Sequence, residues 1–251
     1  MPAAYDNYDY PSYWKGRSYE HNSEFIAIKS LLTKISKINK SIEIGAGYGR
    51  LLPSYLFRVK RALLTDPSAK LISLGMKKYS KNKKVSFLQT KLENLKNKKG
   101  IGNFDLAIMV RVLHHIEDVP LAFNIINSIL SKGGYFILEF ANKNHMKANL
   151  RHFIKGDITY PLDIFPVDIR SKKHLKSKTL PFINYHPDQI IEKLKDAGFD
   201  IIEIRSVSNI RSSILKRVFP LNSLLDLEKL LQKPFARLYF GPSFFVLARK
   251  K

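Results

Sequence analysis

The fold is decided by the stretch Ser41–Ile42–Glu43–Ile44–Gly45–Ala46–Gly47–Tyr48–Gly49–Arg50. Two isoleucines form a short apolar run, and three glycines at alternate positions follow directly. This pattern predicts a buried strand over residues 41–44, a tight turn, and a helix over residues 49–58. Because glycine has no Cβ, the backbone N–H groups of such a turn can approach a ligand closely. We therefore expect a nucleotide-like ligand here, although a purely structural turn would use the same glycines.

The glycine spacing differs from the one that dinucleotide-binding proteins use. Their pattern is G-x-G-x-x-G, whereas Gly49 comes one residue early and gives G-x-G-x-G. An acid, Glu43, stands two residues before the first glycine. The spacing therefore argues against a nicotinamide-dependent oxidoreductase.

Length and composition limit the class of protein. A chain of 251 residues fits one α/β domain, with or without a small cap. The absence of cysteine excludes disulfides, thiolate metal sites and a cysteine nucleophile, and no spacing of histidines and acids predicts a metal site. No apolar run is long enough to span a membrane, and the first ten residues have no signal-peptide core. We therefore expect a cytoplasmic protein.

The formal net charge of +22 has two interpretations. It predicts a polyanionic partner, such as RNA, DNA or an anionic membrane surface. Alternatively, it reflects a lysine-rich background with few acids, because the lysines between residues 77 and 99 lie around predicted surface connections without interleaved aromatic residues. We favour the second interpretation, under which the charge does not require a nucleic-acid partner.

A second apolar strand, predicted over residues 61–65, ends at Asp66–Pro67–Ser68. Asp66 follows the glycine turn by about twenty residues, and an acid at the end of such a strand can accept hydrogen bonds from both hydroxyls of a ribose. Pro67 stops the strand before a helix predicted over residues 68–79. Asp66 can also serve as the N-cap of that helix. A third strand is predicted over residues 84–89.

The block from Phe104 to Glu139 contains an apolar strand (104–110), a helix (119–130), a glycine turn and another strand (135–140). Residues that follow a strand lie at the carboxyl edge of the sheet, where open α/β sheets bind ligands. Arg111, His114 and His115 follow the strand 104–110 and should flank the ligand. A histidine there can act as a general base on an acceptor hydroxyl or amine, or can merely hold the loop by hydrogen bonds.

Together, the glycine turn, Asp66 and the block Phe104–Glu139 resemble the class I, Rossmann-like S-adenosylmethionine-dependent methyltransferases, in particular the small "type 11" methyltransferase-domain family. The resemblance implies an α/β, three-layer fold: a seven-stranded, mostly parallel sheet with an antiparallel last strand and helices on both faces. It also implies S-adenosyl-L-methionine as cofactor and S-adenosyl-L-homocysteine as product. The cofactor-binding residues expected in the family segment are Glu43, Gly45, Ala46, Gly47, Gly49, Asp66, Pro67, Leu92 and Arg111. The expected catalytic residues are His114 and His115.

The match departs from the family pattern after the third strand. Family members commonly place there an acid that contacts the adenine amino group, whereas this chain has Lys91. Leu92 can still pack on the adenine face, and Glu93 is a candidate substitute for the acid. This departure motivates the alternative of a non-catalytic binding module that retains the fold.

Three segments lie outside the family pattern. Residues 1–40 form an aromatic arm and a helix predicted over 18–38, which either closes over the ligand with Tyr13 and Arg17 as cofactor-binding residues or simply packs on the sheet. Residues 141–186 and 208–233 interrupt the methyltransferase domain predicted over 41–251 and are predicted to be helical caps. The apolar residues of the second cap predict a cover over an apolar acceptor, a surface that touches membrane, or ordinary packing.

The favoured function is methyl transfer to a small-molecule or lipid-like acceptor, with the two insertions forming the acceptor pocket. An RNA methyltransferase is the alternative that the charge supports, although no separate RNA-binding module and no Asn-Pro-Pro-aromatic signature is evident. The last strand is predicted over residues 243–249, antiparallel at the edge of the sheet. It follows a helix predicted over 187–197 and a strand predicted over 199–207.

Overall fold

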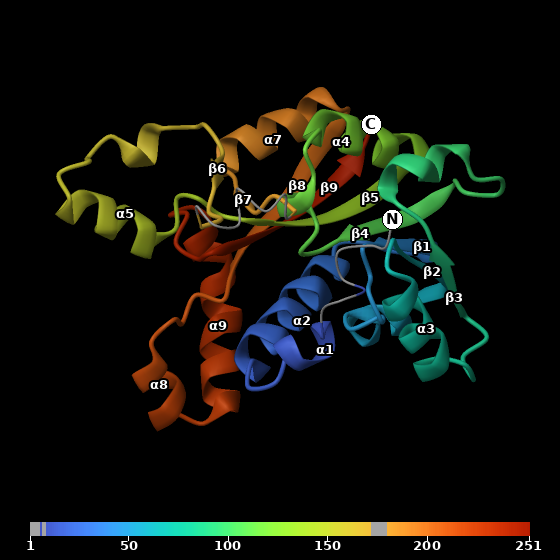
Figure 1. Cartoon of the computed structure of the whole chain (residues 1–251), viewed down its shortest axis with the longest axis horizontal. Coiled ribbons are helices and arrows are strands. Elements are labelled where there is room, and N and C mark those ends of the chain that lie inside the picture. Colours follow the sequence, from blue (N-terminus) through green and yellow to red (C-terminus); the bar gives the residue numbers. More distant parts are fainter. Residues whose placement is uncertain (1–5, 7–8, 172–179) are drawn as a thin grey trace.

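The computed structural model describes residues 6, 9–171 and 180–251. Within them, a seven-stranded sheet has the strand order β3-β2-β1-β4-β5-β9-β8 (Figure 1). Its strands are β1 (Ile38–Ile44), β2 (Val59–Asp66), β3 (Val85–Gln89), β4 (Phe104–Met109), β5 (Leu130–Ala141), β8 (Phe199–Val207) and β9 (Ser243–Lys250). All neighbours pair in parallel except β9, which is antiparallel to both β5 and β8. The predicted fold class is confirmed.

Helices cover both faces of the sheet. In Figure 1, α4 (Val119–Ile129) and α7 (Pro187–Asp196) lie above the sheet, and α2 (Ser18–Leu32) and α3 (Ala69–Lys78) lie below it. The apolar side chains of Ile42 and Ile44 belong to the core under α4 and α7. A second core joins the opposite face to α2. Both faces are thus closed by apolar burial, which fixes the strand ends that carry the site.

The last strand is not at the edge of the sheet, contrary to the prediction. β9 is inserted between β5 and β8, and β8 is the edge strand. Six of its eight residues, Ser243–Ala248, are buried. An internal position gives this apolar strand hydrogen-bonding partners on both sides, which an edge would not supply.

The helix predicted over residues 49–58 is wrong. Two short 3₁₀ turns occupy this segment, η1 (Leu52–Ser54) and η2 (Leu56–Arg58). Gly49 has φ +75°, which is outside the helical region, and Tyr55 has φ −133° and ψ −15°. The backbone at Tyr55 turns its buried hydroxyl inward to Glu43, so an uninterrupted helix cannot form.

The helix predicted over residues 18–38 is shorter, since α2 ends at Leu32. The guanidinium of Arg58 donates to the carbonyls of Leu32 (3.0 Å) and Ile35 (2.5 Å), at the last residue of the helix and just beyond it. Ile38 then pairs with Val59 as the first residue of β1. The remaining predicted strands and helices are present, with ends displaced by a few residues; β5 in particular begins at Leu130.

The two insertions contain elements of their own. The first holds α5 (Met146–Ile154), η5 (Tyr160–Leu162) and the short pair β6 (Val167–Asp168) and β7 (Ile183–Asn184); its residues 172–179 lie outside the described residues. The second holds α8 (Ser213–Val218) and α9 (Leu221–Ala236), separated at Pro220. Of the helices that the structure describes, none is both long and apolar enough to span a bilayer.

Candidate functional site

The glycine turn connects β1 to η1, and its geometry requires glycine. Gly45, Gly47 and Gly49 have φ values of +66°, +56° and +75°. A Cβ on Gly45 would lie 2.2 Å from a methyl carbon of Val112. The turn therefore depends on glycine both for its left-handed backbone and for close packing.

Three amides of the turn bond within the protein. Ala46 donates to the carbonyl of Thr65 (2.9 Å), Gly49 donates to Ala46 (3.0 Å), and Gly47 donates to the carboxylate of Asp66 (2.9 Å). The expectation that these N–H groups are available to a ligand is therefore wrong for all three. The turn instead brings its backbone close to side chains at the carboxyl edge of the sheet, with Gly45 half-buried against Val112 and Gly47 buried against Leu71 and Tyr10.

Asp66 ends β2 directly beside this turn. One carboxylate oxygen accepts the Gly47 amide and the other accepts the Ser68 amide at 2.8 Å. Burial raises the pKa of this carboxyl, and the two amides act in the opposite direction. The N-cap of α3 is Ser68, whose hydroxyl accepts from the Leu71 amide. Because a carboxylate can accept about four hydrogen bonds, Asp66 retains capacity for a ligand. Pro67 follows it half-buried.

Glu43 supports the turn from inside the protein. Its side chain is buried and accepts a 2.6 Å hydrogen bond from the Tyr55 hydroxyl. Burial raises the pKa of Glu43 to about 7, although the Tyr55 hydrogen bond opposes the change. Glu43 is thus held behind the turn, where it stabilises the backbone rather than facing solvent.

The N-terminal arm covers the glycine turn. The ring of Tyr10, the first residue of α1 (Tyr10–Tyr13), lies 3.8 Å from the position that a Cβ on Gly47 would take. Tyr13 stacks on Tyr10 with ring centroids 6.2 Å apart. Trp14 follows, and its buried indole nitrogen has no hydrogen-bond partner within the described part of the chain. Aromatic side chains of the arm therefore lie over the turn, and whether they act as a lid over a ligand stays a prediction.

Trp14 packs against two arginines that form ion pairs with the same acid, Glu24. The guanidinium carbons of Arg50 and Arg111 are 3.5 and 4.8 Å from the centroid of the Trp14 ring. Glu24, buried in α2, accepts from Arg50 at 2.5 Å and from Arg111 at 2.6 Å. Burial raises the pKa of Glu24, but the two guanidinium charges outweigh it and the net pKa is lowered. This ion-pair network joins α2, the turn and the end of β4.

Sequence reasoning missed Glu24, although a signal exists. Glu24 precedes Ala27 and Ile28 by three and four residues, and both are fully buried. An acid on the buried face of an amphipathic helix requires a cationic partner. The two arginines that supply it are 26 and 87 residues away in the chain, so their pairing was not predictable from local sequence.

Arg111 adopts a left-handed backbone with φ +59°. Its amide donates to Glu139 at 2.7 Å, and Glu139 also accepts the Ser243 hydroxyl at 2.5 Å. Burial lowers the pKa of Arg111, but the carboxylates of Glu24 and Glu139 outweigh this and raise it. Arg111 is therefore a fixed cation at the predicted site.

His114 and His115 form η4 (Leu113–His115) and face the end of the first insertion. The ring of His114 lies 4.3 Å from that of Phe182, between centroids, and His115 Nδ1 bonds the Pro181 carbonyl at 2.7 Å. Burial, with the nearby His115 and Arg111, lowers the pKa of His114 well below its usual value. His114 is thus a neutral imidazole near pH 7, and His115 holds the insertion in place.

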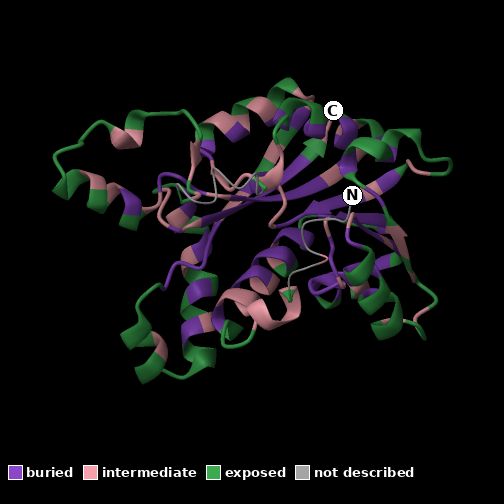
Figure 2. Ribbon diagram, in the orientation of Figure 1, coloured by how far each residue is buried: buried purple, intermediate pink, exposed green. Residues whose placement is uncertain are grey.

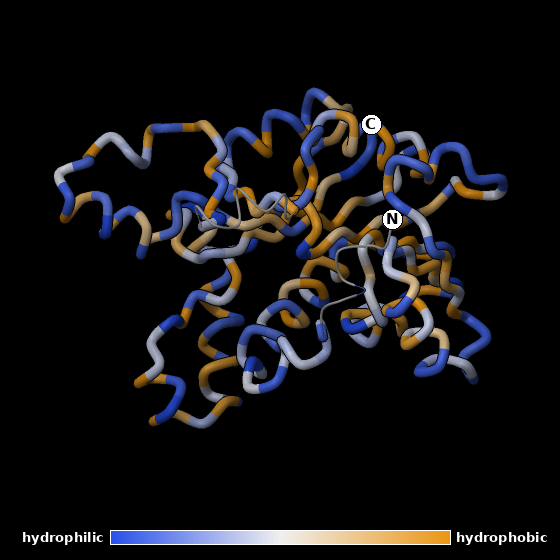
Figure 3. Tube along the Cα trace, in the orientation of Figure 1, coloured by the Kyte–Doolittle hydropathy of each residue, from blue (hydrophilic) through white to orange (hydrophobic). Residues whose placement is uncertain are grey.

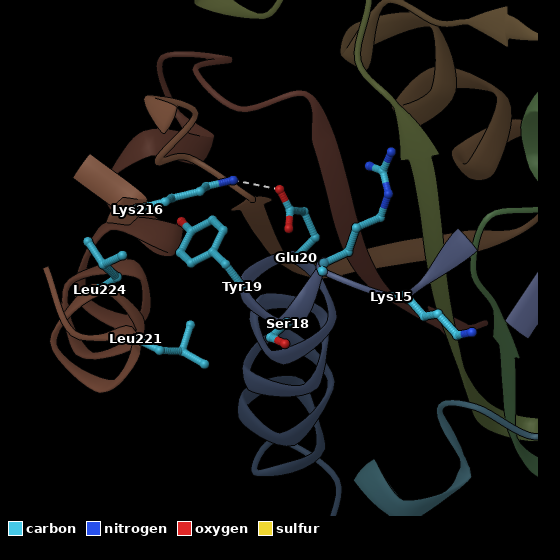
Figure 4. Close-up of a pocket in the computed structure, with 9 residues that line it drawn as sticks. Lys15, Ser18, Tyr19, Glu20, Lys216, Leu221 and Leu224 are labelled. Carbon is cyan, nitrogen blue, oxygen red and sulfur yellow. Dashed lines mark hydrogen bonds and ion pairs between the residues drawn. The ribbon is translucent and has the colours of Figure 1, made fainter. Parts of the chain in front are cut away.

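Leu92 and Arg17, both predicted to bind the cofactor, do not lie beside the glycine turn. Leu92 is buried in the core with residues of α4. Arg17 is exposed above Tyr13, 4.3 Å from its ring centroid, and borders a surface hollow of about 530 Å³ between the start of α2 and the second insertion (Figure 4). The hollow is lined by Lys15, Gly16, Arg17, Ser18, Tyr19, Glu20, Lys216, Leu221 and Leu224. The described residues contain no group of histidines and acids that could hold a metal ion.

Known proteins share both the central segment and the fold. Residues 42–138 match the family model described as a methyltransferase domain. An S-adenosylmethionine-dependent methyltransferase from Thermotoga maritima is 17% identical with a TM-score of 0.63, over 99% of this chain and 98% of that chain. The N-methyltransferase NodS from Bradyrhizobium japonicum, in complex with S-adenosyl-L-homocysteine, is 13% identical with a TM-score of 0.61, over 98% and 94%.

A third structure is a methyltransferase complexed with the Trm112 activator from Haloferax volcanii, which is 13% identical with a TM-score of 0.63, over 98% of this chain and 96% of that chain. No curated protein matches this chain in sequence. The matched segment and the strand order together make the chain similar to the class I S-adenosylmethionine-dependent methyltransferases in its central segment and in its fold. S-adenosylmethionine is the methyl donor of this family.

Proposed function

We propose that the chain binds S-adenosylmethionine between the glycine turn, Asp66 and the N-terminal arm, and transfers its methyl group to a small-molecule or lipid-like acceptor. The observation that carries the proposal is the direct hydrogen bond between Gly47 and Asp66, because it joins the glycine turn to the carboxylate. Asp66 would accept the ribose hydroxyls. Gly45, Ala46 and Gly47 would face the methionine part.

The arm supplies features that fit the charged end of the donor. The buried indole N–H of Trp14 has no partner among the described residues and is suited to donate to a carboxylate. Arg111 holds positive charge beside it. Tyr10 and Tyr13 add apolar cover that excludes water. A buried donor and a fixed cation on one side of the turn match the α-carboxylate of the methionine part.

The donor supplies a reactive sulfonium methyl, so the protein mainly has to align and desolvate the acceptor. His114, held neutral by burial, can accept a proton from an acceptor hydroxyl or amine. Phe182 lies over the same ring and gives this side of the site an apolar wall. An acceptor with an apolar body and a hydroxyl or amine fits this wall and this base.

An RNA acceptor is the second candidate, and the net charge of +22 favours it. One experiment distinguishes the two classes of acceptor. The purified protein is incubated with S-adenosylmethionine carrying a deuterated methyl group and with cell extract divided into lipid, small-molecule and RNA fractions. We expect mass spectrometry to detect the labelled methyl group in the lipid or small-molecule fraction. Label confined to RNA would replace the first candidate with the second, and failure of calorimetry to detect donor binding would overturn both.

A further inference from the structure

The helix α5 exposes an apolar face that no part of the described chain covers. Met146, Leu150, Phe153 and Ile154 recur at spacings of four, three and one residues, which places them on one side of a helix. Their exposed fractions are 50%, 54%, 65% and 75%. The opposite side faces the protein, since Ala148 is buried. The helix thus turns its apolar side outward and its small residue inward.

The same character continues in neighbouring segments. After α5, Ile158, Leu162 and Phe165 are 69%, 80% and 71% exposed. In the second insertion, α8 and the residue after it expose Ile214, Leu215, Val218 and Phe219. Figure 2 shows exposed residues along α5 and α8, and Figure 3 shows hydrophobic residues among them. Exposed apolar side chains that gather in this way mark an interaction surface.

Basic residues flank these apolar side chains. Lys147 and Arg151 lie on α5 and Arg217 lies on α8, and neither helix contains an acid. Lys216, also on α8, pairs with Glu20 of α2. The acids of the segment after α5 have local partners. Those pairs are Asp157 with His152, Asp163 with Lys143, and Asp168 with Arg170. The surface therefore combines outward apolar side chains with positive charge.

Both helices lie at the edge of the sheet that carries the glycine turn. β5 runs parallel to β4 and leads to α5, and β8 has the same direction and leads to α8. In Figure 1 both helices project on one side of the molecule, α5 at the upper left and α8 at the lower left. One flat partner can therefore meet both helices and at the same time face the carboxyl edge.

We propose that α5, the segment that follows it and α8 together dock the protein on the surface of an anionic phospholipid bilayer. A bilayer offers apolar acyl boundary to the outward leucine, isoleucine and phenylalanine side chains, and anionic headgroups to the lysines and arginines. A second copy of the chain, itself carrying +22 charges, would be repelled. RNA would pair with the cations, but it gives no burial to aliphatic side chains such as Ile154 and Leu162. The docking is independent of which acceptor is methylated.

The test uses the full chain and sedimentation with vesicles of phosphatidylcholine alone or mixed with phosphatidylglycerol. We expect binding to the anionic vesicles, little binding to the neutral ones, and weaker binding as salt is raised. The double variant Phe153→Asp/Ile154→Asp should lower partition into anionic vesicles by about tenfold or more. The matched control is Met76→Asp/Leu121→Asp. These two apolar residues lie on α3 and α4, away from the proposed surface, and are 55% and 47% exposed. The control changes the net charge by the same amount and should bind anionic vesicles as the parent does.

Three results would overturn the docking proposal. The first is no binding to anionic vesicles, and the second is an equal loss in the control variant. The third is evidence that the surface binds another partner. Such evidence would be an RNA gel shift, or a dimer in sedimentation equilibrium, that the parent shows and Phe153→Asp/Ile154→Asp loses. Calorimetry of S-adenosylmethionine binding without vesicles, on the parent and both variants, keeps failure of docking distinct from failure of the proposed function.

Discussion

The amide of Gly47 donates a 2.9 Å hydrogen bond to the carboxylate of Asp66, so the turn after β1 and the end of β2 are directly joined. The second carboxylate oxygen accepts the Ser68 amide. Asp66 thus fixes two backbone segments while it faces the proposed ribose position. Its substitution should affect ligand affinity and local order together.

Asp66→Asn should weaken S-adenosylmethionine binding by about ten- to a hundredfold, because hydrogen bonds to a charged acceptor contribute about 1.5–3 kcal/mol. The amide NH₂ also cannot accept from either backbone N–H. Isothermal titration calorimetry measures the affinity. Asp200→Asn is the control, since Asp200 is exposed on the edge strand β8. An unchanged affinity in Asp66→Asn would remove Asp66 from the proposed site.

Gly45→Ala should lower the free energy of unfolding more than Gly156→Ala does. Both substitutions strain a left-handed backbone, but only the one at Gly45 also creates a steric clash. Gly45 has φ +66° and an added Cβ would lie 2.2 Å from Val112, whereas Gly156 has φ +81° and nothing within 4 Å. The left-handed strain of about 1–2 kcal/mol is common to both variants. The clash at Gly45 should add about 1–3 kcal/mol. Urea denaturation of both variants measures the difference, and equal losses would show that the close packing at Val112 is unimportant.

Glu43 should make the protein less stable as pH rises. Its pKa in the folded protein is about 7, above the ordinary 4.5. Between these values the folded state keeps a proton that the unfolded chain has lost, so raising the pH favours unfolding, with a total effect on the order of 3 kcal/mol. Glu43→Gln retains an acceptor for Tyr55 and removes the titration. The stability of this variant relative to the parent should therefore increase from about pH 4.5 to pH 7.5.

Denaturant unfolding at several pH values measures this effect. Glu93→Gln, at an exposed position in η3 (Leu92–Asn97), is the control and should follow the parent at every pH. Other buried groups, such as Glu139 and His114, also titrate on unfolding, but they are common to parent and variant and cancel in the difference. A constant difference between Glu43→Gln and the parent would mean that Glu43 is ionised throughout.

The sequence predicted the parts of the site that local pattern controls. Alternating glycines define the turn, and apolar runs that stop at Asp66 and Arg111 define two strand ends, so their meeting at one edge follows from parallel pairing. The apolar run of β9 favours an internal strand over the predicted edge, but which two strands flank it depends on long-range pairing that a local pattern does not carry. The inward turn of Tyr55 depends on Glu43, which lies in another element.

Long-range charge pairing was also beyond prediction. Arg17 was expected at the ligand from its place in the arm, but it borders the hollow beside α8, and Arg50 and Arg111 hold Trp14 instead. The difference is set by Glu24, which pairs with both arginines across the fold. Ion pairs between distant elements leave no periodic signal in the chain.

Glu24→Gln tests whether this pairing holds the arm. Breaking a buried ion pair costs about 3–5 kcal/mol, and the loss should be near the lower end because Arg111 is partly exposed. Glu20→Gln on the same helix is the control: Glu20 pairs with Lys216 at the surface, where both side chains are about a quarter exposed, and such a pair contributes about 1 kcal/mol or less. Because the lowered pKa of Glu24 stabilises the fold above pH 4.5, this contribution should disappear as the parent is acidified.

Trp14 is the single tryptophan of the chain, so its fluorescence reports on the arm directly. In Glu24→Gln, the guanidinium groups of Arg50 and Arg111 lose their common partner, and the indole between them should become more exposed to water. We expect a red-shifted emission and weaker S-adenosylmethionine binding, with neither change in Glu20→Gln. If Glu24→Gln unfolds as easily as Glu20→Gln and keeps the parent emission, the arm is held by its aromatic contacts with Tyr10 and Tyr13 rather than by the ion-pair network.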